Sequence, residues 1–237
     1  MNWQIARILA SQKAYFYVPK YLVQNLITEE DYLLAIYELL EGKGEARTSE
    51  IASILRVTPG SAEDKLLKMI GVGQLRKNGR GSFEFTQEGY KDAVMAVRKH
   101  RLAERMLTDL LGMGWAEAHD ESRIIEHAID EKIATLIEDK LRPLFCPHGN
   151  PIPDKTGYIS KLNDLPLSKI TGRAVVTRIP YEEFDTLYLV DALGLKPGSE
   201  VVVEREGGEI WLNVLRSGNK IRLSKALADI VRGAQPI

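Results

Sequence analysis

Residues that can bind metal ions gather in the stretch from His100 to His127, which holds three of the chain's four histidines. His100 and Glu104 are four residues apart, so on a helix their side chains share a face. His119 and Glu126 are seven apart, about two turns, and also share a face, whereas His127 points about 100° away from Glu126. Imidazole and carboxylate groups on rigid elements suit a divalent first-row metal ion. The alternative is a solvated helical pair with scattered polar residues, and spacing alone does not decide between the two.

The composition is that of an ordinary globular protein, with 237 residues, 44% hydrophobic and 27% charged, and a net charge of −1. This length predicts one or two domains. Because the chain is not a polycation, any nucleic-acid surface must be a local patch. Cys146 is the only cysteine, which excludes an internal disulfide and a cysteine-rich zinc site. No apolar run approaches the roughly 18 residues of a spanning helix, and the N-terminus does not resemble a signal peptide, so we expect a cytoplasmic protein without membrane contact.

An N-terminal extension, residues 1–27, precedes the first strong helix signal. A helix is predicted over Trp3–Gln12, but no chemistry is assigned to the extension. Thr28 suits an N-cap with Asp31 three residues on, and apolar residues follow at helical spacing until Gly44. Taken alone, Asp31 is equally well explained as the capping acid of this helix.

The next residues follow the pattern of a helix-turn-helix with a wing. A short helix over about 49–55 is followed by a second one up to about residue 70, with Thr58 as its cap and Pro59 at its first position. Two short strands, 74–77 and 82–86, flank the hairpin signal Asn78-Gly79. Residues 28–98 therefore predict a winged-helix DNA-binding domain, and the alternative is a small α/β packing module.

Candidate DNA contacts lie on the second helix and the wing. In this motif the first turn of the second helix faces base edges, and basic side chains meet phosphates. Acidic Glu63 and Asp64 argue against this assignment because they repel phosphate, although a carboxylate can accept a hydrogen bond from cytosine. The candidate residues are Thr58, Gly60, Ser61, Asp64, Lys65, Lys68, Arg76, Lys77 and Arg80.

The rest of the chain predicts three further regions. Apolar helices over about 87–111, from about Trp115, and over 131–140 exceed what the winged helix needs, so residues 99–142 are interpreted as a helical dimerisation domain. Residues 143–170 are rich in proline, glycine and polar residues and predict a linker. Strands at 173–179, 200–205, 209–214 and 220–223 predict a small SH3-like β-barrel over 171–237. The fold class is α+β multidomain.

Four segments together resemble the diphtheria toxin repressor family of metal-dependent transcription regulators: TEEDYLLAIYELLE, RKHRLAERMLTDLLG, AHDES followed by IEH, and HGNPIP. The resemblance covers roughly residues 28–237. It implies a homodimer that binds double-stranded operator DNA and represses metal-uptake genes when Mn²⁺ or Fe²⁺ is bound, with Zn²⁺ or Co²⁺ as substitutes in vitro. It implies no small organic substrate and no enzymatic activity.

The resemblance also implies two adjacent metal sites per subunit. One would use His100, Glu104 and His119. The activating site would use Asp31, Glu126 and His127, and the aspartate at position 31 matches the manganese-responsive branch. The remaining ligand position of that site, usually Cys or Glu, is assigned to Ser122, whose hydroxyl is a poor ligand. Glu182 or Glu183 of the C-terminal domain could add a ligand, whereas Cys146 and His148 are interpreted as structural.

The predicted mechanism is that one ion joins Asp31 of the DNA-binding domain to Glu126 and His127 of the dimerisation domain. The two recognition helices of a dimer are then held about one DNA turn apart, roughly 34 Å. Two alternatives remain at this point. One is a winged-helix regulator with a degenerate site that does not respond to metal, and the other is a metal-dependent hydrolase.

Overall fold

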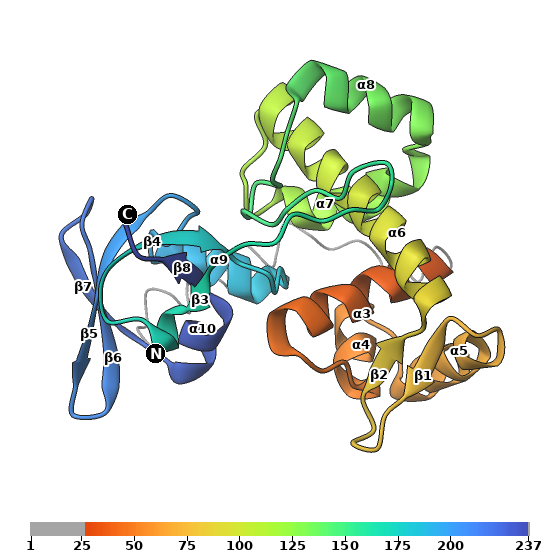
Figure 1. Cartoon of the computed structure of the whole chain (residues 1–237), viewed down its shortest axis with the longest axis horizontal. Helices are drawn as coiled ribbons and strands as arrows, with labels where there is room; N and C mark the ends of the chain where they lie inside the picture. Colours follow the sequence, from red (N-terminus) through yellow and green to blue (C-terminus); the bar gives the residue numbers. More distant parts are fainter. Residues whose placement is uncertain (1–26, 237) are drawn as a thin grey trace.

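A computed structural model describes residues 27–236 (Figure 1), and the helix predicted over 3–12 lies outside these residues. The described chain has three parts in sequence order. A winged helix is followed by a group of helices and then by a C-terminal antiparallel sheet. The predicted α+β multidomain class is confirmed.

The winged helix contains both predicted helices and the hairpin. Its wing differs from a two-residue turn: five residues connect the strands, and Gly81 has a positive φ of 77°. The Asn78 side chain accepts hydrogen bonds from the backbone N–H groups of Arg80 and Ser82, which shapes this loop. The elements are α3 (Glu29–Lys43), α4 (Thr48–Ile54), α5 (Pro59–Gly71), β1 (Leu75–Lys77) and β2 (Phe83–Phe85).

Helix α3 is the central element of the molecule. Every residue from Asp31 to Leu39 is buried, which is expected only for a helix that is covered on all sides. Helix α6 packs along it, α4 and the wing lie on its other sides, and Tyr181 of the C-terminal domain joins the same core. Because α3 touches all three parts of the chain, a change in its position affects all of them.

The part between the winged helix and the C-terminal sheet contains the predicted number of α-helices, but their first and last residues differ from the prediction. Its elements are α6 (Gln87–Arg105), a π-helical turn (Met106–Leu110), α7 (Ala118–Ile125), a 3₁₀ turn (Glu126–Ala128) and α8 (Glu131–Leu141). The second of the three predicted helices begins at Ala118, not at Trp115, and the Trp115 indole donates a hydrogen bond to Asp191 of the C-terminal domain at 2.7 Å. Within residues 27–236, no helix is long and apolar enough to cross a membrane.

The C-terminal domain is a six-stranded antiparallel sheet in the order β3-β8-β4-β5-β6-β7. The four predicted strands are confirmed, whereas β3, β8 and the short helix α10 were not predicted. Apolar side chains of the sheet and of α9 form its core. The elements are β3 (Leu165–Pro166), a 3₁₀ turn (Leu167–Lys169), β4 (Gly172–Arg178), α9 (Phe184–Ala192), β5 (Glu200–Glu206), β6 (Glu209–Val214), β7 (Asn219–Leu223), α10 (Lys225–Ile230) and β8 (Arg232–Ala234).

Residues 143–170, predicted as a linker, are more structured than their composition suggests. Leu165 and Pro166 pair with β8, and Leu167 and Ile170 are buried in the C-terminal core. Earlier in the segment, Cys146, His148 and Asn150 are buried as well. The proline and glycine content correctly indicates turns, but tertiary contacts bury the residues between them.

Candidate metal centre and DNA-binding surface

Six buried side chains from distant parts of the chain converge at one point, which we call the inner centre. Helix α6 supplies two of them and α7 one, the segment before the C-terminal domain supplies two, and the segment before α9 supplies the last. Each is at most 2% exposed. The six residues are His100, Glu104, His119, Cys146, His148 and Glu182. With the neighbouring Glu38 they form two ligand groups that share Glu182: one contains Glu38, His100 and His119, and the other contains Glu104, Cys146 and His148.

The donor atoms of the inner centre have the spacing of metal ligands. Glu104 Oε1 lies 3.1 Å from His100 Nε2, from His119 Nδ1 and from His148 Nδ1. Glu182 Oε2 lies 3.1 Å from His119 Nδ1 and 3.0 Å from His148 Nδ1. Two ligands bound at about 2.1 Å and at right angles to each other are about 3.0 Å apart. Three imidazole nitrogens and two carboxylate oxygens therefore fit a first-row divalent cation.

The protonation of the inner centre reflects its burial and its charges. Burial lowers the pKa of His100, but the Glu104 and Glu126 carboxylates outweigh it and raise this pKa to about 10. Burial and Glu104 raise the pKa of Glu182, whereas His148 and His119 lower it to about 2. Without a cation, protonated imidazoles therefore pair with carboxylates. Those protons must leave before the same nitrogens can ligate, so metal binding releases protons.

Two buried carboxylate oxygens at this centre lack a hydrogen-bond partner among the described residues. They are Glu104 Oε2 and Oε1 of Glu38, a buried residue of α3. Glu38 Oε1 lies 4.0 Å from His119 Nε2. An unpaired buried carboxylate oxygen is costly, and a bound cation removes that cost. This observation supports the fit of the inner centre to a metal ion.

The sequence did not assign a ligand role to two members of the inner centre, Cys146 and His148, or to the neighbouring Glu38. Cys146 and His148 were interpreted as structural, yet His148 Nδ1 contacts both Glu104 and Glu182, and the Cys146 thiol lies 3.7 Å from Glu182 Oε1. Burial, followed by the Glu182 charge, raises the pKa of this thiol to about 12. Glu38 was not considered. The available signals were the Cys-x-His spacing and the position of Glu38, two helical turns after Asp31.

A second group, the outer centre, consists of Asp31, Glu126 and His127. His127 Nε2 lies 3.4 Å from Asp31 Oδ1, and the His127 side chain is 29% exposed. The other oxygen of Asp31 accepts hydrogen bonds from the Thr28 backbone N–H and hydroxyl, at 2.6 and 2.9 Å. Asp31 is thus the capping acid of α3, and its other oxygen faces His127, so the capping role leaves this oxygen available as a ligand.

The two centres share a hydrogen bond. Glu126 Oε2 lies 2.5 Å from His100 Nδ1, while His100 Nε2 faces Glu104 in the inner centre. A carboxylate on one ring nitrogen fixes the orientation and tautomer of a histidine that ligates through the other. Glu126 can therefore ligate in the outer centre and orient a ligand of the inner one.

Ser122 does not lie where the sequence assignment put it. Its hydroxyl donates to the His119 backbone oxygen at 2.7 Å and lies 3.2 and 3.3 Å from the ring nitrogens of His100. The physical reason is that a serine inside a helix bonds to a carbonyl of the preceding turn: the Ser122 hydroxyl is engaged by the His119 backbone oxygen, which turns it toward His100. Ser122 thus belongs to the surroundings of the inner centre.

The predicted base-contacting residues are exposed together at the start of α5. Thr58 caps this helix by accepting from the Ser61 backbone N–H at 3.2 Å. Gly60 and Asp64 are exposed on the same turn. This arrangement leaves the first turn of α5 open to a partner.

Several predicted phosphate contacts are engaged in ion pairs within the protein. Lys65 pairs with Glu29 at 2.8 Å, Lys77 with Glu63 at 3.0 Å and Arg76 with Glu84 at 2.9 Å. Lys68 and Arg80 are exposed, and within residues 27–236 neither forms a salt bridge. Of the two acidic residues that argued against DNA binding, Glu63 therefore holds a basic side chain of the wing, Lys77, in place.

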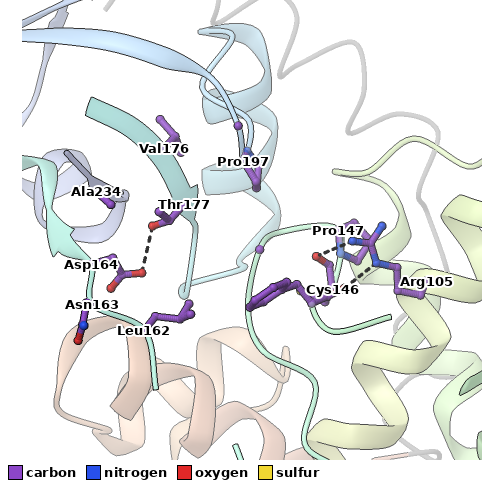
Figure 2. Close-up of a pocket in the computed structure, with 13 residues that line it drawn as sticks. Arg105, Cys146, Pro147, Leu162, Asn163, Asp164, Val176, Thr177, Pro197 and Ala234 are labelled. Atoms are coloured by element: carbon purple, nitrogen blue, oxygen red, sulfur yellow. Dashed lines mark hydrogen bonds between the residues drawn. The ribbon is translucent and has the colours of Figure 1, made fainter. Parts of the chain in front are cut away.

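A groove of about 680 Å³ lies behind the segment that carries Cys146 (Figure 2). Arg105 donates to the backbone oxygens of Phe145, at 2.6 Å, and of Cys146, at 3.4 Å, while Asp164 accepts from Thr177 on the opposite side. Arg105 thereby holds the backbone of this segment from the groove side, and the Cys146 thiol contacts Glu182 in the inner centre.

Comparison with known proteins gives a consistent result along the chain. Residues 26–80 match the N-terminal DNA-binding domain of iron-dependent repressors, and residues 86–154 match their metal-binding and dimerisation domain. The chain is 31% identical over 221 residues to the diphtheria toxin repressor of Corynebacterium glutamicum, covering 86% of this chain and 95% of that protein. It is 29% identical over 220 residues to the iron-dependent repressor IdeR of Mycobacterium tuberculosis, covering 86% and 96%.

Solved structures agree with this result. The IdeR of T. acidophilum has a TM-score of 0.82 and 31% identity, covering 89% of this chain and 99% of that one. A manganese-dependent transcriptional repressor in complex with manganese has a TM-score of 0.78 and 26% identity, covering 88% and 100%. These matches span the winged helix, the helices that hold both centres and the C-terminal sheet. The chain belongs to the diphtheria toxin repressor family of iron-dependent, metal-regulated DNA-binding repressors.

Proposed function

We propose that this chain is a homodimeric repressor of metal-uptake genes, which binds operator DNA in the cytoplasm when Mn²⁺ or Fe²⁺ is bound at the inner and outer centres. Zn²⁺ and Co²⁺ would substitute in vitro. Because members of the family are DNA-binding repressors, the hydrolase alternative is discarded, and no small organic substrate is proposed.

The observation that carries the proposal is where the ligands come from. In the outer centre, Asp31 belongs to α3 of the winged helix, whereas Glu126 and His127 follow α7. In the inner centre, Glu182 belongs to the C-terminal domain and the remaining residues to α6, α7 and the segment after α8. The two centres together link all three parts of the chain.

A bound divalent cation would supply the positive charge that replaces the protons of the cluster. The residues of the chain position the ligands. Glu126 orients His100, and Asp31 caps α3 with one oxygen while it offers the other to the outer centre. A cation that binds between Asp31 and His127 favours the conformation in which these two residues are close, which fixes the position of α3. Because α5 belongs to the same domain as α3, the cation also favours one placement of α5 relative to the dimerisation helices.

The proposed dimer surface is apolar. Exposed leucines lie in the π-helical turn, in α8 and just after it: Leu110, Leu111, Leu136 and Leu144. Large apolar side chains exposed on these helices favour self-association. Two copies joined there would present two α5 helices to successive turns of DNA, roughly 34 Å apart.

The alternative is a winged-helix regulator whose outer centre no longer responds to metal. One observation favours it: the outer centre offers only three side-chain ligands, and one of them, His127, is partly exposed.

The deciding experiment is metal-dependent DNA binding. A duplex that the Mn²⁺-loaded protein selects from a random library is labelled, and its Kd is measured by fluorescence anisotropy with Mn²⁺ and with a chelator. We expect binding to be about 5- to 150-fold weaker with chelator, as a coupling of 1–3 kcal/mol implies. Equal Kd values would overturn the proposal.

Asp31→Asn sharpens this test because the asparagine oxygen still accepts the capping hydrogen bond while the ligand charge is lost. We expect the Mn²⁺ response to disappear with thermal stability nearly unchanged. Glu30→Gln, which removes a neighbouring carboxylate 3.7 Å from His127, is the matched control and should keep the response.

A further inference from the structure

Arg123 lies between ligands of the two centres along the chain. It lies four residues after His119, three before Glu126 and four before His127. Arg123 lies near the end of α7, one turn after His119 and about one turn before the 3₁₀ turn that carries Glu126 and His127. The side chain at this position is a guanidinium, which has five N–H donors and no lone pair for a metal ion.

The contacts of Arg123 extend from α7 to α3. Its Nη2 donates to Glu38 Oε2 at 2.8 Å and lies 3.4 Å from His119 Nε2, and its side chain is 18% exposed. The carboxylates that raise its pKa against the effect of burial are, in order, Glu38, Glu126, Asp120 and Asp31. By contact, the guanidinium thus belongs to Glu38 and His119, and its place in the chain, three residues before Glu126, puts it one helical turn from the outer centre.

Two consequences follow from this placement. The pair with Glu38 ties α7 to α3 in this structure, and it engages one oxygen of Glu38 that could otherwise face the inner centre. The positive charge also opposes the entry of a divalent cation between Asp31 and Glu126, since like charges a few ångströms apart repel by several kcal/mol inside a protein.

We propose that Arg123 is a built-in cation that sets the metal threshold of the outer centre: it weakens divalent-cation binding there and maintains the α3–α7 link until the metal concentration is high enough. This inference rests on the outer centre of the proposed function. It makes Arg123 a determinant of affinity that does not itself ligate.

The test compares Arg123→Gln, which removes the charge, with Arg123→Lys, which keeps it. Free Mn²⁺ is followed by electron paramagnetic resonance as metal is added to the full-length protein. We expect the outer-centre Kd of Arg123→Gln to fall at least about tenfold, because the repulsion is lost, and that of Arg123→Lys to stay within about threefold of the unmodified protein. An unchanged or weaker Kd for Arg123→Gln would overturn the inference. Arg216→Gln, an exposed charge change in the turn before β7, controls for net charge.

The same titration in an Asp31→Asn background separates this inference from the proposed function. If Asp31→Asn removes no binding step, the outer centre itself is wrong. If Asp31→Asn removes one Mn²⁺-binding step and Arg123→Gln leaves the Kd of that step unchanged, the outer centre is correct and only the role of Arg123 is wrong. We expect the gain from Arg123→Gln to vanish in the double variant.

Stability without metal provides a readout independent of affinity. Arg123→Gln leaves the buried Glu38 carboxylate unpaired, so we expect the metal-free protein to melt at a lower temperature and Arg123→Gln/Glu38→Gln to recover most of the loss. A melting temperature unchanged by Arg123→Gln would show that the Glu38 pair does not link α7 to α3.

Discussion

Gly42 is the point at which the C-terminal domain rests on α3. A Cβ at this position would lie 2.7 Å from Tyr181 Cβ and 3.2 Å from the Tyr181 backbone N and Cα. Tyr181 is 6% exposed and belongs to the winged-helix core, and Lys43 Nζ lies 4.0 Å from the centre of its ring. The next residue, Glu182, enters the inner centre. Gly42→Ala should therefore push the segment that carries Tyr181 and Glu182 away from α3, and with it move Glu182 out of the inner centre.

The size of the effect follows from comparison with a second helical glycine. Gly71, in the last turn of α5, has open space where its Cβ would be. An alanine in a helix gains up to about 1 kcal/mol over glycine in intrinsic propensity, and this gain applies to both positions. Only Gly42→Ala also forces backbone atoms apart, which costs about 1–3 kcal/mol. We expect Gly42→Ala to be less stable than Gly71→Ala by about that amount.

Thermal unfolding of the metal-free and Mn²⁺-loaded proteins measures this difference. For a chain of this size each kcal/mol corresponds to about 2–4 °C in Tm. Displacement of Glu182 should also weaken Mn²⁺ binding at the inner centre in Gly42→Ala but not in Gly71→Ala. Equal Tm values and equal Mn²⁺ affinities for the two variants would refute the docking of Tyr181 on Gly42.

Three further predictions concern other parts of the molecule. The pKa of Asp164 is lowered, because hydrogen bonds from Arg178, Thr177 and Arg232 outweigh the effect of burial. The ionised Asp164 therefore stabilises the fold. This stabilisation is fully present above the unfolded pKa of about 4 and is lost as the pH falls through the lower folded pKa. Asp164→Asn should thus cost about 1.5–3 kcal/mol in urea unfolding at pH 7, and a difference that does not shrink on acidification would contradict the assignment. Lys68→Ala should reduce the slope of log K against log salt for DNA binding by about 0.9, and an unchanged slope would exclude a phosphate contact. Mn²⁺ at 100 times its Kd should stabilise the protein by about 2.7 kcal/mol, and His148→Ala should lose most of the inner-centre share of this gain.

Much of the fold could be predicted from local patterns in the sequence. Thr28 and Asp31 identify the start of α3 because an N-cap and its capping acid are three residues apart. The helix-turn-helix, the wing and four strands of the C-terminal sheet follow from periodicity and turn residues. The spacing of His100 and Glu104, and the resemblance of the surrounding motifs to a metal-dependent family, pointed to the two centres.

Only the tertiary structure decided which further side chains join those centres and which do not. Cys146, His148 and Glu182 reach the inner centre because a proline-rich segment and the C-terminal domain fold back onto α6, and no local pattern records a contact between segments so far apart in the chain. The orientation of α7 turns Ser122, which was assigned to the outer site, toward His100, and it turns Arg123, for which the sequence predicted no role, toward Glu38. Periodicity follows from hydrogen bonds between residues three or four apart, whereas a metal centre depends on how whole elements pack.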